Sequence, residues 1–253
     1  MGILNVTPDS FSDGGQFLDP SKAIARGIEM MEEGATIIDV GGESTKPGVE
    51  RVSMDEELSR VIPVINALSK AGAMVSVDTM RAEVAALAVA SGARIINDVS
   101  GGQADVAMHA TAAALKVQYI CMHWRGQSKD MDALAVYDDV TTEVIAELTK
   151  QVASALLAGI EPTRLVIDPG LGFAKNAEQN WEILRNIDKF KELGFPILVG
   201  GSRKRFLGGS DPLERESASI ALTTWLATKD IWGVRTHTVK PHVDAIRTVG
   251  QIA

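Results

Sequence analysis

The segment AMVSVDTMRAEVAALAVASGARIINDVS, residues 73–100, contains the unit from which the fold can be predicted. It begins with a short apolar run that includes Asp78 and ends with a second apolar run that carries Asn97. Between the two runs lies the longer segment MRAEVAALAVASGA, residues 80–93. Near-continuous apolar runs are typical of parallel strands that are covered on both faces. The segment therefore predicts one strand, a crossover and a second, parallel strand.

The same unit recurs along the whole chain. Eight β-rich runs alternate with longer segments, and the runs are MGILNVT (1–7), ATIIDVGG (35–42), AMVSVDT (73–79), RIINDVS (94–100), QYICMHW (118–124), RLVIDPG (164–170), PILVGGS (196–202) and WGVRTHTV (232–239). Eight such repeats without a polar linker predict one (β/α)8 TIM barrel over residues 1–253. An open, doubly wound sheet would have similar strands, but its polar strand ends would gather at one switch point.

Helical period marks the segments between the runs. After a Ser53/Glu56 capping box and before Gly72, the apolar residues at helical spacing are Leu58, Val61, Ile62, Ile65 and Leu68. From about Asp138 to Gly159, one helical face carries Val140, Val144, Leu148, Val152 and Leu156. The longest connections follow the first two strands. The first of them, PDSFSDGGQFLDP at 8–20, is expected to be mobile and to end where Asp19 caps a helix that begins at Pro20.

Composition and charge narrow the classes of function. The chain is 45% hydrophobic, and its formal net charge of −8 is spread along the sequence, so we expect neither nucleic acid nor an anionic membrane as a partner. No stretch approaches the roughly 18 apolar residues of a membrane span. The single cysteine, Cys121, lies in an apolar run, which favours a reduced core thiol and a cytoplasmic protein.

The site of such a barrel forms where the strands end. The polar residues that interrupt the apolar runs there are Asn5, Glu43, Thr45, Asp78, Asn97, His123, Asp168, Ser202, Lys204, Arg235 and His237. Each by itself could cap a helix or begin a loop. Asp78, Asn97 and Asp168 argue against that interpretation, because polar groups inside or directly after buried strands are costly without a ligand.

Two carboxylates and a carboxamide without His or Cys ligands do not resemble a zinc site. They suit a polar planar molecule that presents an amino group beside a ring N–H, because a carboxylate can accept from both donors. Arg235 and His237, two residues apart on one predicted strand, are expected to point to the same side and to hold an anion with Lys204 and Ser202.

A local basic cluster can bind an anion in spite of the acidic net charge. An opposite charge at about 4 Å contributes about 4 kcal/mol at an effective dielectric of about 20, whereas charges beyond about 8 Å are screened. The alternative is a structural ionic network, in which Arg235 and Lys204 pair with Asp78 or Asp168.

Seven blocks of the sequence closely resemble dihydropteroate synthases, and they occur in the same order over essentially the whole chain. They are GILNVTPDSFSDGG (2–15), IIDVGGESTKPG (37–48), SVDT (76–79), IINDVSGG (95–102), DPGLGF (168–173), GGSRKRFLG (200–208) and VRTHTV (234–239). The stretches MHWRG and RKRFLG resemble the actinobacterial branch. The resemblance implies a transferase of folate synthesis that joins a dihydropterin pyrophosphate to p-aminobenzoate, a target of sulfonamides and a homodimer through outer helices.

The resemblance also implies roles for individual residues. Pterin binding is implied for Asp78, Asn97, Met122, Asp168, Phe173 and Lys204, of which Asp78, Asp168 and Lys204 are implied to be catalytic. Pyrophosphate binding is implied for Asn5, Thr45, Lys46, Arg235 and His237, with Asn5 as a ligand of Mg2+. The p-aminobenzoate pocket is implied to comprise Thr45, Pro47, Phe173, Ser202 and Lys204.

Two departures from the family and two rival functions complete the sequence-based picture. Lys46 stands where the family usually has Arg, which predicts a weaker anion contact. Members usually carry further residues before the MGILN strand, so we expect a longer natural chain and a less covered barrel floor.

A methyltetrahydrofolate–corrinoid methyltransferase would share the fold but not explain the TPDSFSDGG loop, Lys204 or the Arg235/His237 pair. A silent pterin-binding paralogue would not need every catalytic position filled. His123 is expected to pack as a hydrogen-bonded loop residue.

Overall fold

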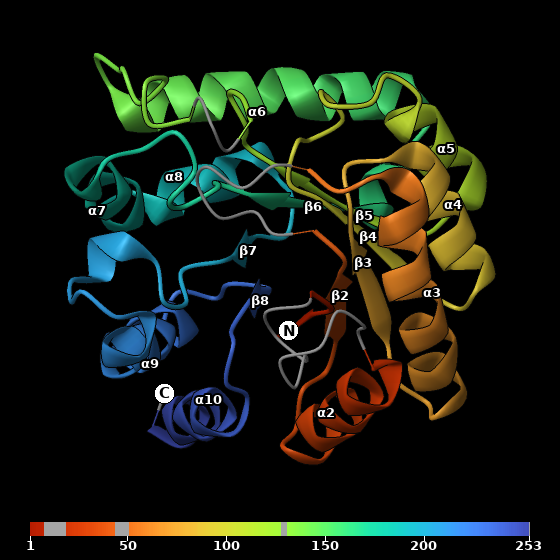
Figure 1. The fold of residues 1–253 in the computed structure, drawn as a ribbon. Coiled ribbons are helices and arrows are strands. Elements are labelled where there is room, and N and C mark those ends of the chain that lie inside the picture. The colour runs from red at the N-terminus through yellow and green to blue at the C-terminus, as the bar shows by residue number, and fades with distance from the viewer. Residues whose placement is uncertain (8–18, 44–50, 128–130, 253) are drawn as a thin grey trace.

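Among the residues that the structure describes, eight parallel strands form the centre of the molecule. Helices surround them (Figure 1). The protein is described by a computed structural model that covers residues 1–7, 19–43, 51–127 and 131–252. The strands are β1 (Gly2–Asn5), β2 (Ile38–Gly41), β3 (Val75–Asp78), β4 (Ile95–Asp98), β5 (Gln118–Met122), β6 (Leu165–Asp168), β7 (Leu198–Val199) and β8 (Gly233–Val234). Each of the eight predicted runs contains one of these strands, so that prediction is confirmed.

The strands close into a barrel. β1 to β6 form one sheet in sequential order, and β7 pairs with β8 in a second. Parallel bridges from Gly2 to Thr236 and from Ile167 to Ile197 join the edges of these two sheets. Because both edges of the long sheet are thereby paired, the TIM barrel is confirmed and the open doubly wound sheet is excluded.

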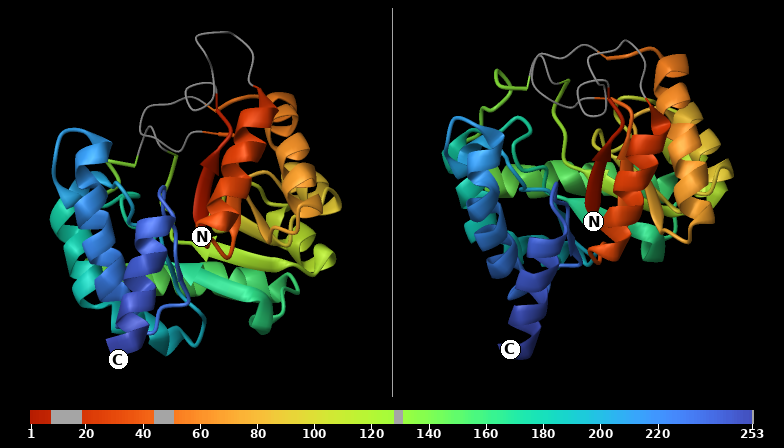
Figure 2. Two further views of the ribbon diagram at one scale, coloured as in Figure 1. Left: turned by 90° about the horizontal axis from the view of Figure 1, so that it is seen from below. Right: turned by 60° about the horizontal axis from the view of Figure 1, so that its bottom comes forward.

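The helices lie on the outside of the strands, as the further views show (Figure 2). They are α2 (Pro20–Glu32), α3 (Met54–Lys70), α4 (Ala82–Ala90), α5 (Met108–Leu115), α6 (Val140–Leu157), α7 (Ala177–Arg185), α8 (Ile187–Phe190), α9 (Glu216–Ala227) and α10 (Lys240–Ile252). Single 3-10 turns span Pro162–Arg164, Lys191–Leu193, Arg205–Leu207 and Pro212–Arg215. In the part of the chain that the structure describes, none of these helices has the length and apolar character needed to cross a membrane.

Local caps explain where the helices begin. The Asp19 carboxylate accepts a hydrogen bond from the backbone N–H of Ser21 at 2.9 Å, and α2 begins at Pro20 as predicted. Ser53 accepts from the backbone N–H of Glu56 at 3.2 Å and caps α3. The Glu56 side chain pairs with Arg60 one turn further on. Of the two hydrogen bonds of the predicted capping box, the described contacts thus include only the one that Ser53 accepts.

The interior of the barrel changes character along its axis. The part nearer the amino ends of the strands, called the lower part here, is an apolar cluster of Ile37, Ile95, Ile120, Val166 and Leu198. Side chains alternate with a period of two along a strand, so the residues two positions further on also face inward. On three of the strands these residues are Asp39, Asn97 and Asp168. The apolar lower interior therefore supports a polar layer near the carboxyl ends of the strands.

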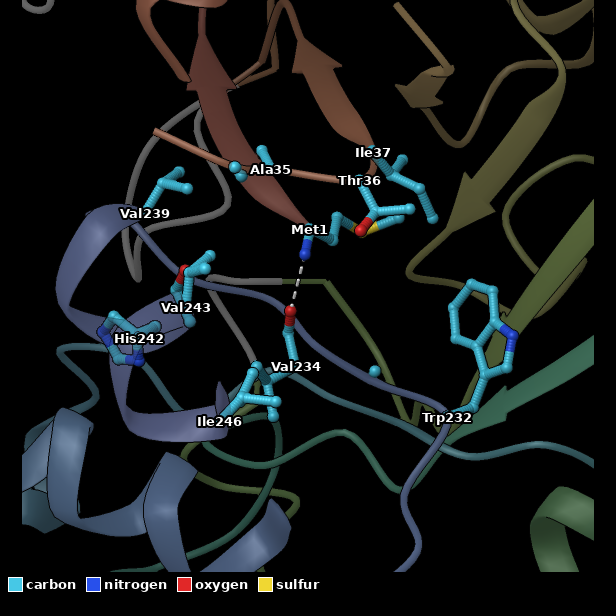
Figure 3. Close-up of a pocket in the computed structure, with 14 residues that line it drawn as sticks. Met1, Ala35, Thr36, Ile37, Trp232, Val234, Val239, His242, Val243 and Ile246 are labelled. Atoms are coloured by element: carbon cyan, nitrogen blue, oxygen red, sulfur yellow. Dashed lines mark hydrogen bonds between the residues drawn. The ribbon is translucent and has the colours of Figure 1, made fainter. Parts of the chain in front are cut away.

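A separate cavity of about 330 Å³ opens at the opposite end of the barrel (Figure 3). The backbone carbonyl of Val234 there accepts a hydrogen bond from the amino group of Met1 at 2.9 Å. Side chains from around β1, β8 and α10 line it, among them Met1, Thr36, Trp232, Val234, His242 and Ile246. None of the residues predicted to bind substrate lines this cavity.

The larger hydrophobic core fills the space between strands and helices, and Leu68 of α3 is fully buried in it. We expect Leu68→Ala to lower the free energy of unfolding by about 2–5 kcal/mol, because it removes buried methyl groups and leaves a cavity. Leu157→Ala, at a position that is 89% exposed near the end of α6, should change it by less than about 0.5 kcal/mol. Urea denaturation measures both, and equal effects would contradict this description of the core.

Candidate active site at the carboxyl ends of the strands

A buried ionic cluster occupies the polar layer of the barrel. The Asp39 carboxylate on β2 accepts hydrogen bonds from Nε of Arg235 at 2.6 Å and from Nδ2 of Asn97 at 2.9 Å. Nη2 of Arg235 donates to Asp78 on β3 at 2.5 Å. The structure thus brings Asp78, Asn97 and Arg235 together as expected. It also realises part of the ionic network left open by the sequence, because Arg235 pairs with Asp78.

Burial shifts the acid–base behaviour of the two predicted catalytic carboxyls. Desolvation raises the pKa of Asp78 to about 7, although the adjacent Arg235 guanidinium acts in the opposite direction. Desolvation also raises the pKa of Asp168 to about 6, against the effect of the hydrogen bond from the Gly170 N–H. Both carboxyls therefore titrate closer to neutrality than an exposed aspartate.

The segment after β6 joins Asp168 to a second part of the site. The backbone N–H of Gly170 donates to Oδ1 of Asp168 at 2.7 Å, which orients the carboxylate. Nζ of Lys204 lies 4.1 Å from the centre of the Phe173 ring, in a cation–π contact. Burial lowers the pKa of Lys204 to about 8, with Arg235 the next cause and the negative charge of Asp168 opposing it. Lysine and aromatic ring are thus held side by side next to the carboxylate.

Ser202 and His237 form a hydrogen-bonded pair at the rim. The backbone N–H of His237 donates to Oγ of Ser202 at 3.3 Å, and Oγ lies 3.0 Å from Nδ1 of His237. Burial and nearby cations lower the pKa of His237 to about 3, so the ring is neutral near pH 7. The roles in this contact depend on the tautomer of His237: with the ring hydrogen on Nε2, Nδ1 accepts from the Ser202 hydroxyl and the ring presents an N–H donor.

The predicted anion site differs from the structure in one detail. β8 ends at Val234, so Arg235 and His237 lie beyond the strand. The backbone nevertheless stays in the barrel for two more residues, because the Arg235 N–H donates to the carbonyl of Val199 and Thr236 bridges Gly2. The guanidinium of Arg235 faces Asp39 and Asp78, whereas the His237 ring pairs with Ser202.

Two further predicted residues frame the polar layer. Met122, 4% exposed, ends β5 and is the register partner of Asp168. Asn5 ends β1 opposite Gly41 and is partly exposed. No cluster of three or more His, Cys, Asp or Glu side chains that could bind a metal ion occurs within the described ranges.

Several residues named from the sequence lie elsewhere or cannot be placed. Thr45, Lys46 and Pro47 fall outside the described residues, as do residues 8–18 of the predicted mobile loop (8–20). Glu43 forms ion pairs with Arg51 at 2.9 Å and with Arg81 at 2.8 Å, and these pairs connect it to the neighbouring segments. Cys121 is fully buried in the outer core, as expected, where burial raises the pKa of its thiol.

Two charged residues of this region were not identified from the sequence. Asp39 contacts both Asn97 and Arg235, and a charged residue inside the apolar run ATIIDVGG was the signal that could have revealed it. Lys175 is 8% exposed and contacts His123, but it follows β6 by seven residues. No strand-end pattern points to a residue so far along a loop.

The raised pKa of Asp78 predicts a pH-dependent stability. The carboxyl loses its proton near pH 3.8 when unfolded but near 7 in the folded protein, so its contribution to stability is present at low pH and falls as the pH rises between these values. Asp78→Asn removes this dependence. We therefore expect the free energy of unfolding of the variant, relative to wild type, to rise between about pH 4 and 7 in urea denaturation. A difference between Asp78→Asn and wild type that stays constant over this pH range would contradict the shift.

Comparison with known proteins gives this site a family. The family model described as pterin binding enzyme matches residues 1–237. Dihydropteroate synthase of Mycobacterium leprae is 49% identical over 260 residues, which cover 99% of this chain and 92% of that protein. The structure of Xanthomonas albilineans dihydropteroate synthase with 4-aminobenzoic acid matches with a TM-score of 0.93 and 41% identity, covering 100% of this chain and 92% of the other. The complex of the Xanthomonas albilineans enzyme with 7,8-dihydropteroate matches with a TM-score of 0.90 and 38% identity, again covering 100% and 92%. The chain therefore belongs to the pterin-binding enzyme family and, within it, to the dihydropteroate synthases.

Proposed function

We propose that the residues of this barrel condense 6-hydroxymethyl-7,8-dihydropterin pyrophosphate with p-aminobenzoate, giving 7,8-dihydropteroate and pyrophosphate. The observation that carries the proposal is the convergence of Asp78, Asn97, Asp168 and Lys204 at the carboxyl ends of the strands. The family membership supplies the substrate class, and the similar structures contain 4-aminobenzoic acid or 7,8-dihydropteroate.

The pterin ring fits between donors and acceptors of complementary type. Oδ1 of Asp168 is bound by the loop, which leaves Oδ2 to accept from an amino group or ring N–H. Asn97 uses its Nδ2 on Asp39, which leaves its carbonyl oxygen as an acceptor. Met122 and Phe173 supply apolar surface for the ring, and Lys204 lies at its edge.

The reaction breaks the C–O bond between the hydroxymethyl carbon and pyrophosphate, and it forms a C–N bond to the arylamine, which loses one proton. Positive charge develops on the pterin as the leaving group departs, and the Asp78 carboxylate stabilises it. Arg235 and the Nε2–H of His237 interact with the leaving group. Arg235 can do so while it is paired, because two of its five N–H donors engage Asp39 and Asp78 in the contacts described.

Magnesium fits this site as a substrate-bound ion. The Asn5 amide oxygen is a hard ligand at the end of β1, and Mg2+ often binds through one or two protein groups together with substrate phosphates. The lack of a three-residue acidic or histidine cluster among the described residues agrees with that mode of binding. When bound, Mg2+ would offset the negative charge of pyrophosphate.

The second substrate is proposed to bind beside Lys204. Phe173 and Ser202 flank this lysine in the described part of the site, and we propose that Thr45 and Pro47 complete the pocket. Thr45 and Lys46 are further proposed to contact pyrophosphate. Because Lys46 offers a point charge instead of the planar fork of arginine, its contact is proposed to be the weaker one.

We further propose that residues 1–253 form one domain, that the protein acts in the cytoplasm and that it is a homodimer. Support for these three points comes from the uninterrupted strand–helix succession, from the reduced and buried Cys121, and from the family, respectively. Size-exclusion chromatography with light scattering tests the dimer, and a monomer mass at micromolar concentration would rule it out.

The direct test is to incubate the protein with dihydropterin pyrophosphate, p-aminobenzoate and Mg2+, and to quantify dihydropteroate and pyrophosphate. We expect both products in equal amounts. Absence of both would overturn the proposal. If the protein still bound the pterin in that case, it would be a silent pterin-binding paralogue.

Two substitutions test the assigned residues. Lys204→Ala and Asp168→Asn should each lower kcat/KM by about 100-fold or more, because each removes an interaction with the reacting pterin. Far-UV circular dichroism should remain that of the wild type. Lys150→Ala, on the exposed surface of α6, is the matched control for the lysine and should retain full activity. Near-normal activity of both site variants would show that the substrate binds elsewhere.

A further inference from the structure

A buried lysine next to the site is not used by the proposed chemistry. Lys175 follows β6 and is 8% exposed. Its Nζ donates to the carbonyls of Gly170 at 3.0 Å and Phe173 at 2.9 Å, and lies 2.9 Å from Nδ1 of His123. Its three ammonium hydrogens thus have three acceptors, and none of these acceptors is charged. Burial of an ammonium among neutral groups is costly, and the arrangement therefore calls for a role.

His123 connects this lysine to the outer helix. Burial lowers the pKa of Lys175 to about 7, with the negative charge of Asp168 opposing it. The Glu147 carboxylate can only accept, so the ring hydrogen of His123 resides on Nε2 and Nδ1 accepts from the ammonium form of Lys175. Nε2 then donates to Glu147 of α6 at 2.9 Å. Arg125 binds both oxygens of Glu147, at 2.6 and 2.9 Å, and its guanidinium lies 3.6 Å from the centre of the Tyr137 ring. Burial lowers the pKa of His123 to about 4, in agreement with a neutral ring.

The loop over residues 169–174 has a conformation that needs such an anchor. Gly170, Gly172 and Ala174 all have positive φ, at 69°, 75° and 47°. The left-handed region is unfavourable for alanine by about 1 kcal/mol. A Cβ on Gly170 would lie 2.5 Å from the backbone oxygen of His123, so the loop passes very close to the segment after β5. Two carbonyls of this loop point inward, and Lys175 satisfies both.

The same loop orients groups that are proposed to touch the pterin. Gly170 directs the Asp168 carboxylate through its N–H, and Phe173 contacts Lys204 through its ring. We propose that Lys175 and His123 act as a pair of positioning residues, which hold the 169–174 loop so that Asp168 and Phe173 keep the geometry that binds the pterin. This inference rests on the proposed function, since it concerns the same pterin site.

Removal of the ammonium tests the lysine. Lys175→Met retains the length of the side chain but no donor, and it should raise KM and the dissociation constant for dihydropterin pyrophosphate about tenfold or more. We expect kcat to change by less than about threefold, because the Lys175 ammonium is engaged by His123 and the carbonyls of Gly170 and Phe173. Lys150→Met is the control for the substitution itself and should leave both constants unchanged. Steady-state kinetics and isothermal titration calorimetry measure these values, alongside Tm.

A second pair of variants isolates the hydrogen bond and does not depend on Lys175→Met being stable. His123→Asn places an amide oxygen near the former position of Nδ1 and keeps an acceptor for Lys175, whereas His123→Leu keeps volume without an acceptor. We expect His123→Leu to weaken pterin binding as Lys175→Met does, and His123→Asn to remain within about threefold of wild type. An equal loss of pterin binding in both His123 variants would overturn the proposal that the two residues act as a pair.

Tm changes without changes in pterin KM or Kd would equally overturn the proposal, because the pair would then be structural only. Failure of the proposed function has a different signature. In that case the wild type itself forms no dihydropteroate. The dissociation constants for the pterin in wild type and variants still show whether Lys175 and His123 hold the 169–174 loop in the conformation that binds it.

Discussion

The rest of the structure depends on the alternation of side chains along parallel strands that close into a barrel. Every second residue faces the interior, and closure leaves that interior no access to solvent from the side. The sequence therefore has to supply inward residues that fit each level. Ile37, Ile95 and Val166 fill the lower level, and the residues two positions beyond them form the polar layer. One register thus determines both the core that stabilises the barrel and the orientation of the site residues.

Desolvation is the cost of building a polar layer on an apolar one, and the protein meets it by mutual pairing. Arg235 is shared by Asp39 and Asp78, and Asn97 completes the coordination of Asp39. Asp39 is thus the common partner of two residues that are proposed to bind substrate. Such an arrangement is organised in advance of any ligand, because the same bonds that compensate for burial also fix the side-chain directions. Burial in this layer raises the pKa of Asp78 and Asp168, whereas the nearby Arg235 guanidinium acts in the opposite direction.

The segments that follow β6 and β8 are also held by contacts within the protein. The segment after β6 carries three positive φ values and still has a fixed shape, because Asn180 of α7 binds the Gly172 N–H at 2.7 Å and Lys175 satisfies two inward carbonyls. After β8, Arg235 and Thr236 stay hydrogen-bonded to the β7 and β1 segments, while the side chains of Arg235 and His237 bind different partners. Backbone hydrogen bonds hold the barrel strands, whereas buried side chains hold these loops.

The sequence by itself determined the eight strands, the barrel, the caps at Asp19 and Ser53, and the polar strand ends that include Asp78, Asn97 and Asp168. These features are encoded locally, since period, capping and the position of a polar residue in an apolar run are all read within a few residues. Only the tertiary structure decided the partners. The 2.6 Å contact of Arg235 with Asp39 joins residues 196 positions apart, and the contact of His123 with Lys175 joins residues 52 apart. No local pattern specifies such pairs, because they form only when folding brings different strands of the barrel side by side in an interior where a buried charge must find a partner.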